Sequence, residues 1–396
     1  MTQAPAIILD QPPLQAEPAV RALLGLLPEA RLVGGCVRDT LARLPVADID
    51  LATPRRPESV METLTRAGWR VAPTGIAHGT VTASLQGRSF EVTTLRRDVE
   101  TDGRRAVVAF TDDWRQDAAR RDFTINALSM TADGAVYDYF GGIVDLQAGH
   151  VRFVGDPATR IAEDYLRILR FFRFQARYGR GVPDVAALAA IGSAVPGLAT
   201  LSPERIWSEL LRILAAPDPS ASLELMAECG VLTVIVPEGA EPRRLMRLIA
   251  AGAPADPLLR LAALLDGDPT SFADRLRLSA AERTRLIALR ESPTPDPSLD
   301  DAALRRLLAD TPREILMGRS WLAGDGSVEW NRLRARLSTT AVPVFPLEGR
   351  DVLALGVSPG PQVGALLRAL RAWWLAGGCV ADAAACRAEL ARLCRG

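Results

Sequence analysis

Two aspartates, Asp48 and Asp50, stand two positions apart in a segment whose pattern predicts a strand over residues 48–53. Side chains at positions i and i+2 of a strand point to the same face, so both carboxylates could bind one divalent cation. Carboxylate oxygens suit Mg²⁺, which takes few protein ligands and completes its shell with water and substrate phosphates. An isolated D-x-D is more often a solvated strand end, so the magnesium assignment depends on the motif that precedes it.

A glycine pair, Gly34 and Gly35, comes before the aspartates, with twelve residues between Gly35 and Asp48. The pair ends a short apolar segment and precedes residues 37–44, which can form a helix. Glycines leave backbone N–H groups open at the positive end of a helix, where a triphosphate can bind. Arg38 lies one turn inside that helix. The two motifs together predict a metal ion and a triphosphate at one site.

An arginine pair, Arg120 and Arg121, precedes an apolar segment whose pattern predicts a helix. The pair would stand at the start of that helix. Guanidinium groups match phosphate and ribose oxygens, so we expect the pair to bind a nucleotide. Asp122 follows at the position of a helix N-cap, and it is either that cap or a further part of the nucleotide site. Farther along, the glycines at 141–142 are expected to form a turn between strands, capped by Asp145.

A fourth motif carries Asp164, Arg167, Arg170 and Arg173. The first three are spaced by three residues and would share one face of a helix, with Arg173 at its edge. A carboxylate accepts hydrogen bonds and a guanidinium donates them. Cytosine and adenine present an amino donor beside a ring-nitrogen acceptor, whereas uracil and guanine present a carbonyl beside an N–H, so this face could select C and A. The alternative is an ion pair between Asp164 and an arginine of its own helix.

The elements that must position these motifs fall into two groups. Residues 31–154 alternate short β-type segments with helical ones, which predicts an α+β unit with a small mixed sheet. Strands are expected over 31–35, 48–53, 81–85 and 90–95, and a second helix over 57–67. From Asp156 onward, leucine, alanine and arginine recur at helical spacing, which predicts helices to the C-terminus.

The composition excludes several classes of protein. A chain of 396 residues with 48% apolar and 24% charged residues is long enough for two or three folded units. Five cysteines without a C-x-x-C pair and only two histidines indicate neither a disulfide framework nor a thiolate or histidine-rich metal site. No apolar segment is long enough to span a membrane and the N-terminus does not resemble a secretory signal, so a cytoplasmic location is expected.

The charge distribution is more informative than the net charge, which is zero. The basic residues are all arginine, and residues 151–180 hold seven arginines against three acidic residues. This local excess favours anion binding in the segment that carries the fourth motif, although a solvated arginine-rich face would give the same count.

All four motifs occur in the order and approximate spacing of the class II tRNA nucleotidyltransferases, the CCA-adding enzymes, and of the related bacterial poly(A) polymerases. The resemblance extends over residues 31–215 and includes segments 91–96 and 101–104 and Leu201–Ile206. It implies a polymerase-beta-like nucleotidyltransferase head that carries the metal-binding aspartates, followed by a helical neck that selects the base, a body and a tail. The expected boundaries are 1–30 for an N-terminal lead-in helix, 31–154 for the head, 155–216 for the neck and 217–396 for the body and tail.

The resemblance also implies roles for individual residues. It implies Asp48 and Asp50 as Mg²⁺ ligands, with Glu91 as a candidate third catalytic carboxylate. The expected nucleotide contacts are Gly34, Gly35, Arg38, Arg120, Arg121, Asp122, Asp164, Arg167, Arg170 and Arg173. Two departures from the family pattern stand out: a glycine is replaced near Arg43, and no family motif follows Ala215.

The implied activity is template-free, Mg²⁺-dependent transfer of C, C and A from CTP and ATP to the 3′ end of tRNA, with the acceptor arm held by the helical C-terminal half. A poly(A) polymerase is the alternative within the family, although the C-terminal end lacks the strongly basic tail often found there. A non-catalytic RNA-binding protein of the same fold is a remote alternative. Trp373 and Trp374 could stack on RNA, but adjacent tryptophans on an amphipathic helix favour packing. The sequence does not fix the oligomeric state.

Overall fold

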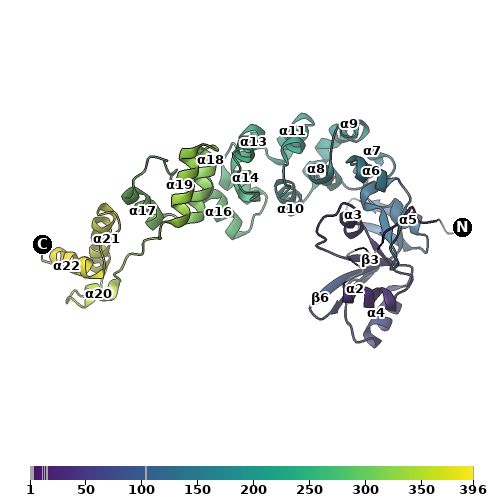
Figure 1. Ribbon diagram of the computed structural model, residues 1–396, viewed down its shortest axis with the longest axis horizontal. Helices are drawn as coiled ribbons and strands as arrows, with labels where there is room; N and C mark the ends of the chain where they lie inside the picture. The colour runs from purple at the N-terminus through teal and green to yellow at the C-terminus, as the bar shows by residue number, and fades with distance from the viewer. Residues whose placement is uncertain (1–3, 11, 13, 15–16, 103–104, 396) are drawn as a thin grey trace. The chain divides into compact units, whose positions relative to one another are not determined.

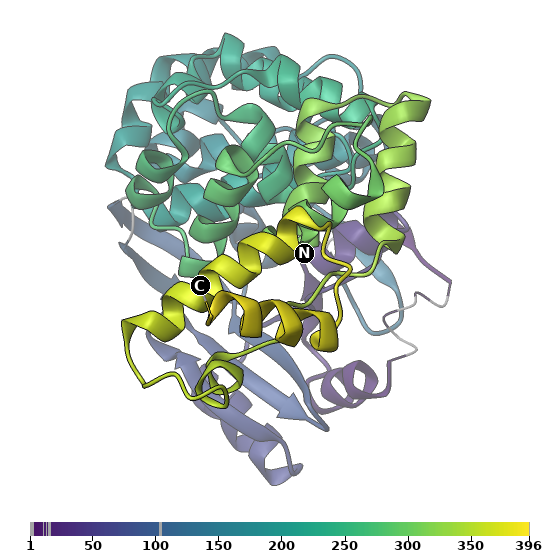
Figure 2. The same ribbon diagram turned by 90° about the vertical axis from the view of Figure 1, so that its left-hand side faces the viewer.

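The computed structural model describes residues 4–10, 12, 14, 17–102 and 105–395. The chain divides into two compact units, Met1–Ile235 and Val236–Gly396. Unit 1 holds every strand of the described residues, and unit 2 is built from helices (Figures 1 and 2).

Within the described residues, eight strands form one mixed sheet in the order β1-β10-β9-β2-β3-β6-β5-β4. They are β1 (Ile7–Ile8), β2 (Arg31–Val33), β3 (Asp50–Thr53), β4 (Arg70–Gly75), β5 (Thr80–Leu85), β6 (Arg88–Thr94), β9 (Leu128–Met130) and β10 (Ala135–Asp138). β3 and β6 are parallel, and the other neighbours are antiparallel. β7 (Arg96–Asp102) and β8 (Arg105–Phe110) pair separately. The mixed sheet is confirmed. Gly103 and Arg104, in the loop expected at 101–104, lie outside the described residues.

The predicted strand over 48–53 needs a correction at its start. β3 begins at Asp50, so Asp48 lies in the loop before it. The argument that both aspartates share one strand face is therefore wrong, although both still line one cleft. The helix expected over 37–44 is α3 (Gly35–Leu41), which begins directly after the strand because Gly34 supplies the sharp turn.

Two helices begin with proline, α2 (Pro18–Leu26) and α4 (Pro57–Arg66), and are labelled in Figure 1. Their apolar sides are buried in the core of the sheet. Leu23 and Leu64 are fully buried there together with Leu51 of β3. Each such side chain stabilises the fold by roughly 2 kcal/mol. This core holds β3 rigidly, and β3 carries Asp50 at its first position.

The segment after β10 starts a helix and is not a turn between strands. Gly141 has a φ of +80°, and α6 (Gly142–Ala148) follows at once. A Cβ at Gly142 would lie 2.1 Å from the carbonyl oxygen of Thr124, so only glycine fits. The cap is Asp138, whose carboxylate accepts hydrogen bonds of 2.9 to 3.1 Å from the amides of residues 140–143. Asp145, the expected cap, lies within α6.

The helices that complete unit 1 are α5 (Trp114–Ala119), α7 (Pro157–Glu163), α8 (Leu166–Tyr178), α9 (Val185–Ala194), α10 (Pro203–Leu214), α11 (Ser220–Glu228) and α12 (Val231–Ile235). Aromatic contacts attach α8 to the segments around the sheet. The ring of Phe153 stacks on Phe171 of α8 at 6.0 Å, and Phe123 lies 5.2 Å from Phe174 of α8. These four rings fix the helix that carries three of the predicted arginines.

Unit 2 contains α13 (Pro242–Ala250), α14 (Pro257–Leu264), α15 (Pro269–Arg275), α16 (Ala280–Glu291), α17 (Asp301–Asp310), α18 (Arg313–Ala323), α19 (Val328–Thr339), α20 (Gly349–Leu353), α21 (Pro361–Ala376) and α22 (Ala383–Leu393). The prediction of a helical second half is confirmed. Trp374 is buried and donates to the carbonyl of Ala381, while Trp373 is half exposed, which agrees with packing at the edge of a core. None of the described helices is long and apolar enough to cross a membrane.

Candidate active site

A cleft of about 660 Å³ in unit 1 gathers the predicted motifs. With the exception of Glu91, all of the predicted site residues line it. Its lining consists of Gly34, Gly35, Arg38, Asp39, Ala47, Asp48, Asp50, Arg96, Arg120, Arg121, Asp122, Asn126, Asp164, Leu166, Arg167, Arg170, Arg173, Phe174 and Arg205. Arginines outnumber aspartates in this lining, so the cleft suits a polyanion such as a nucleoside triphosphate.

The three predicted carboxylates line a neighbouring cavity that shares Asp48 and Asp50 with this cleft. Asp50 lies opposite Glu91 in the parallel register of β3 and β6. Burial raises the pKa of Asp50, and the charges of Glu91 and Asp48 raise it further, while Arg121 opposes them. Carboxylates that disfavour one another's charge gain from a cation placed between them.

These carboxylates fit a magnesium ion that shares its shell with substrate. Among the described residues, no three His, Cys, Asp or Glu side chains are arranged to hold a metal ion by themselves. Mg²⁺ is commonly bound through one or two carboxylates plus water and substrate phosphates and seldom by an all-protein cage. Asp48 and Asp50, which line a cleft suited to phosphates, match that pattern.

The glycine pair and Arg38 form a tightly packed corner. Gly34 has a φ of +70°, and a Cβ there would lie 3.0 Å from Nη1 of Arg121, so a side chain would both strain the backbone and displace that arginine. Arg38 is buried and donates to both carboxylate oxygens of Asp39 and to Oδ1 of Asn126. Two of its five N–H groups remain for a ligand.

The arginine pair ends a helix and does not open one, which corrects the sequence prediction. Arg120 is the C-cap residue of α5. Both guanidinium groups are held by Asp117, a buried residue that sequence reasoning missed, at 2.8 Å from Arg120 and 3.3 Å from Arg121. Burial lowers the pKa of Arg120 to about 10, with Asp117 opposing. Asp117 therefore fixes the direction in which both arginines point.

Asp122 is not a helix N-cap, because its carboxylate is occupied in a different way. It accepts hydrogen bonds from Nε of Arg170 at 2.6 Å, from Nδ2 of Asn126 at 3.0 Å and from the amide of Phe123 at 2.9 Å. Burial alone would raise the pKa of Asp122, but Arg170 and Asn126 bring it below the ordinary value. Asp122 lines the cleft and at the same time anchors Arg170 of α8.

The fourth motif is split by the end of a helix. Asp164 is the C-cap residue of α7 with extended backbone, so only Arg167, Arg170 and Arg173 share α8. Asp164 pairs with Arg205 of α10 at 2.7 Å, which excludes the predicted alternative of an ion pair within its own helix.

Each of the three α8 arginines has its own acidic partner. Arg167 pairs with Glu163 and also donates to the carbonyl of Arg160 at 2.8 Å. Arg173 forms an ion pair of 3.1 Å with the buried Glu209 of α10. Arg170 is held by Asp122. The three arginines are thus oriented by contacts with the flanking helices and the segment after α5.

Sequence reasoning missed the residues that position the site. Arg205 lies in the motif Leu201–Ile206, and Asn126 lies in the segment after the arginine pair. Both belong to recognised motifs, but the sequence assigned neither residue a role. Asp117 stands three residues before Arg120 and four before Arg121, a helical spacing that could have indicated its role. The contact of Glu209 with Arg173 joins two helices and carries no spacing signal. Only the folded arrangement identifies that second contact.

Comparisons with known proteins agree with this geometry. Residues 30–152 match the family described as the Poly A polymerase head domain, and residues 184–241 match the family described as a probable RNA and SrmB-binding site of polymerase A. The chain is 38% identical to the mitochondrial CCA tRNA nucleotidyltransferase 1 of Mus musculus, over 88% of this chain and 83% of the relative. It is 32% identical to the CCA-adding enzyme of Levilactobacillus brevis, over 86% of this chain and 87% of the relative.

Solved structures give the same answer for the fold. The CCA-adding enzyme of Bacillus stearothermophilus in complex with CTP is similar with a TM-score of 0.75 and 25% identity, over 96% of this chain and 98% of that one. The CCA-adding enzyme of Thermotoga maritima, complexed with tRNA, has a TM-score of 0.69 at 21% identity, over 98% and 99% of the two chains, and supports the fold alone. The chain therefore belongs to the family of CCA tRNA nucleotidyltransferases, whose members are also called CCA-adding enzymes.

Proposed function

We propose that this nucleotidyltransferase adds C, C and A in turn to the 3′ end of tRNA, taking CTP and ATP as substrates and using no nucleic-acid template. One observation carries the proposal: a single cleft brings the carboxylates of Asp48 and Asp50, the arginine pair and the Asp164 group together. Such a cleft can bind the triphosphate of a nucleotide at one end and select its base at the other. Relatives named for CCA addition support the same activity.

In the proposed reaction, the RNA 3′-hydroxyl attacks the α-phosphorus and pyrophosphate leaves. Asp48 and Asp50 would hold Mg²⁺, which when bound supplies a Lewis acid for the attacking oxygen and the departing phosphates. Arg120 and Arg121, fixed by Asp117, would offset the charge of the triphosphate. Arg38 would contribute its two remaining N–H groups beside the glycine turn.

Base selection would depend on Asp164 and the arginines of α8. The Asp164 carboxylate accepts one hydrogen bond from Arg205 and one from the amide of Leu166. Each of its oxygens can still accept one further hydrogen bond. The amino group of C or A can donate there. The carbonyl of U or G would face the carboxylate without a proton between them, which leaves both acceptors unsatisfied.

The experiment that tests the proposal supplies labelled nucleotides, singly and in pairs, to a tRNA transcript lacking its last three residues. We expect CTP alone to add two residues, and CTP with ATP to add three residues and stop. Asp48→Ala should abolish addition while the thermal unfolding midpoint stays near that of the wild type, because Asp48 is exposed. Open-ended addition from ATP alone would establish the poly(A) polymerase alternative in place of CCA addition.

The proposal extends to the partner and the domains. Residues 217–396 would bind the acceptor arm of tRNA, and 31–154 and 155–216 would act as head and neck. A cytoplasmic location stays a prediction, since the relatives include both proteins named as mitochondrial and bacterial proteins.

A further inference from the structure

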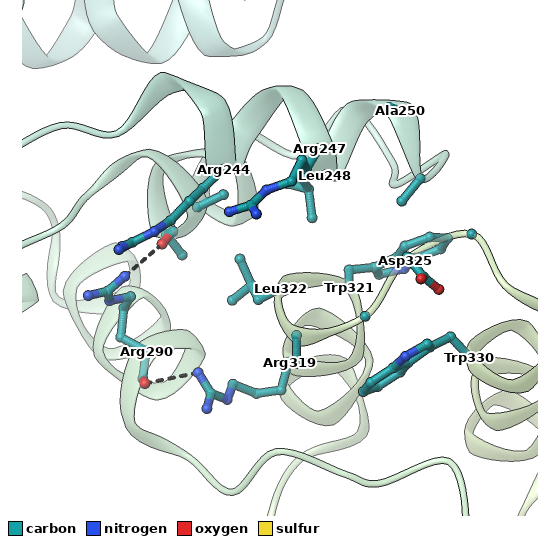
Figure 3. Close-up of a pocket in the computed structure, with 16 residues that line it drawn as sticks. Arg244, Arg247, Leu248, Ala250, Arg290, Arg319, Trp321, Leu322, Asp325 and Trp330 are labelled. Carbon is teal, nitrogen blue, oxygen red and sulfur yellow. Dashed lines mark hydrogen bonds between the residues drawn. The ribbon is translucent and has the colours of Figure 1, made fainter.

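A second cleft, with a volume of about 850 Å³, lies wholly within unit 2 (Figure 3). Residues of helices α13, α14, α16, α18 and α19 and of the loop before α19 form its walls. Its size falls within the range of sites that bind small molecules or single nucleotide units. The cleft begins beyond residue 241, where the match to the RNA-binding family ends.

Two arginines of this cleft are fixed by backbone carbonyls and not by carboxylates. Nη1 of Arg290 donates to the carbonyls of Ala262 at 3.1 Å and Leu265 at 2.7 Å, at the end of α14. Nη1 of Arg319 donates to the carbonyls of Leu289 at 3.0 Å and Arg290 at 2.9 Å, at the end of α16. These contacts hold both guanidinium groups in place. Within the part of the chain that the structure describes, neither group forms an ion pair with a carboxylate, although the charge of Asp266 acts on Arg290.

The pKa shifts of the same two arginines reflect this crowding of positive charge. Burial lowers the pKa of Arg319, and the neighbouring charge of Arg290 lowers it further. Burial also lowers the pKa of Arg290, with the charge of Arg244 acting in the same direction and Asp266 opposing. A bound anion would relieve the repulsion.

Arg247 is the residue free to bind such an anion. Its guanidinium has no hydrogen-bond or ion-pair partner within the part of the chain that the structure describes, whereas Arg244 pairs with Asp266 at 2.7 Å. In Figure 3 the side chain of Arg247 extends from α13 into the cleft. Asp325 is the one acidic residue among the lining residues described, and its carboxylate accepts from the amide of Ser327.

Two tryptophans, Trp321 and Trp330, form the other end of the cleft in Figure 3. Both are half-buried and held in place. The guanidinium of the buried Arg334 lies 3.5 Å from the ring centroid of Trp321, and a Cβ at Gly324 would lie 2.3 Å from the ring of Trp330. Fixed aromatic rings beside a positive region are typical of sites that bind a single RNA strand or a flipped nucleotide.

We propose that this cleft binds a phosphodiester group of the RNA substrate, with Arg247 contacting the phosphate and the tryptophan end accommodating the adjacent nucleoside. The inference rests on the proposed function, since that function supplies RNA as the substrate. It adds a defined contact in unit 2, away from the residues that select and transfer the nucleotide.

The test compares Arg247→Ala with Arg243→Ala, which removes the same charge from an exposed position of α13 outside the cleft. The dissociation constant of the tRNA transcript lacking its last three residues is measured over a range of salt concentrations. For Arg247→Ala we expect the affinity for the transcript to fall about five-fold. The plot of the logarithm of the association constant against the logarithm of the salt concentration should become less steep by about 1. The KM for CTP should stay unchanged, because unit 1 holds the triphosphate site. Arg243→Ala should keep the wild-type slope.

The outcomes separate this inference from the proposed function. If the wild type completes tRNA and both variants have the same salt slope as the wild type, the cleft proposal is wrong and the function stands. If the wild type does not extend tRNA but Arg247→Ala alone weakens binding, the cleft proposal stands and the function is wrong. Equilibrium dialysis with labelled CTP is the remaining measurement. A second CTP site that is lost only in Arg247→Ala would show that the cleft binds free nucleotide, and it would overturn the RNA assignment.

Discussion

Nε of Arg170 lies 2.6 Å from Oδ2 of Asp122, and this bond joins the segment after α5 to helix α8. Both partners line the proposed nucleotide cleft. The bond therefore sets the position of α8, the proposed base-selecting helix, relative to the arginine pair that precedes Asp122. A change in this single contact should affect both stability and selection.

We expect Asp122→Asn to lower the free energy of unfolding by about 3 kcal/mol, because it leaves the Arg170 charge without its buried partner. Urea unfolding at pH 7 measures this loss. Asp112→Asn, which changes an exposed aspartate two residues before α5, is the matched control and should change stability by no more than about 0.5 kcal/mol. Equal losses in the two variants would contradict the assignment of Asp122 as an anchor.

The stability difference between the wild type and Asp122→Asn should depend on pH. The pKa of Asp122 is lowered in the folded state, so its contribution is present above the ordinary carboxyl value of about 4 and is lost as pH falls through the folded value. The stability difference between the wild type and Asp122→Asn should therefore be constant from about pH 7 to 5 and shrink below about pH 4. A difference that persists undiminished at the acid end would show that the carboxylate charge is not what stabilises the fold.

The sequence was sufficient to predict which motifs meet, because the glycine turn, the D-x-D and the arginine pair are local patterns around a mixed sheet. It failed where tertiary contacts override local pattern. No glycine or proline lies between Glu163 and Leu166, yet the backbone is extended at Asp164, whose carboxylate accepts a hydrogen bond from Arg205. The ring of Tyr165 packs over Gly197, where a Cβ would lie 2.2 Å away. Contacts between distant segments of this kind leave no periodic signal.

Asp117 should act as a positioning residue for the arginine pair. Asp117→Asn keeps the size of the side chain but weakens its hold on Arg120 and Arg121, so we expect kcat/KM for CTP and ATP to fall about ten-fold. The dissociation constant for tRNA should stay near the wild-type value. Gln116→Ala, on the exposed side of α5, provides the control. If tRNA binding and nucleotide use fell together, a general loss of structure would explain the result better than misplaced arginines.

Asp164 should control which bases are accepted. Asp164→Ala removes the acceptor for the amino group of C or A, so we expect incorporation of CTP and ATP to fall at least about ten-fold while the discrimination against UTP narrows. Single-turnover assays with each of the four nucleotides measure both effects. Arg205→Gln should produce a milder form of the same change, since it leaves the carboxylate present but loosely held. Unaltered discrimination in Asp164→Ala would place base selection elsewhere.

Arg43 occupies the place where the family pattern has glycine, and it adopts a φ of +56° directly after the C-cap of α3. A left-handed conformation costs an L-residue about 1 to 2 kcal/mol, and helices commonly place glycine at this position for that reason. Arg43→Gly should therefore stabilise unit 1, and the greater freedom of glycine in the unfolded chain reduces the net gain to about 0.5 to 1 kcal/mol. Arg43→Ala keeps the left-handed cost and should give no such gain. Thermal and urea unfolding of the three proteins test this, and a stabilised Ala variant would point to loss of the arginine charge and not to relief of backbone strain.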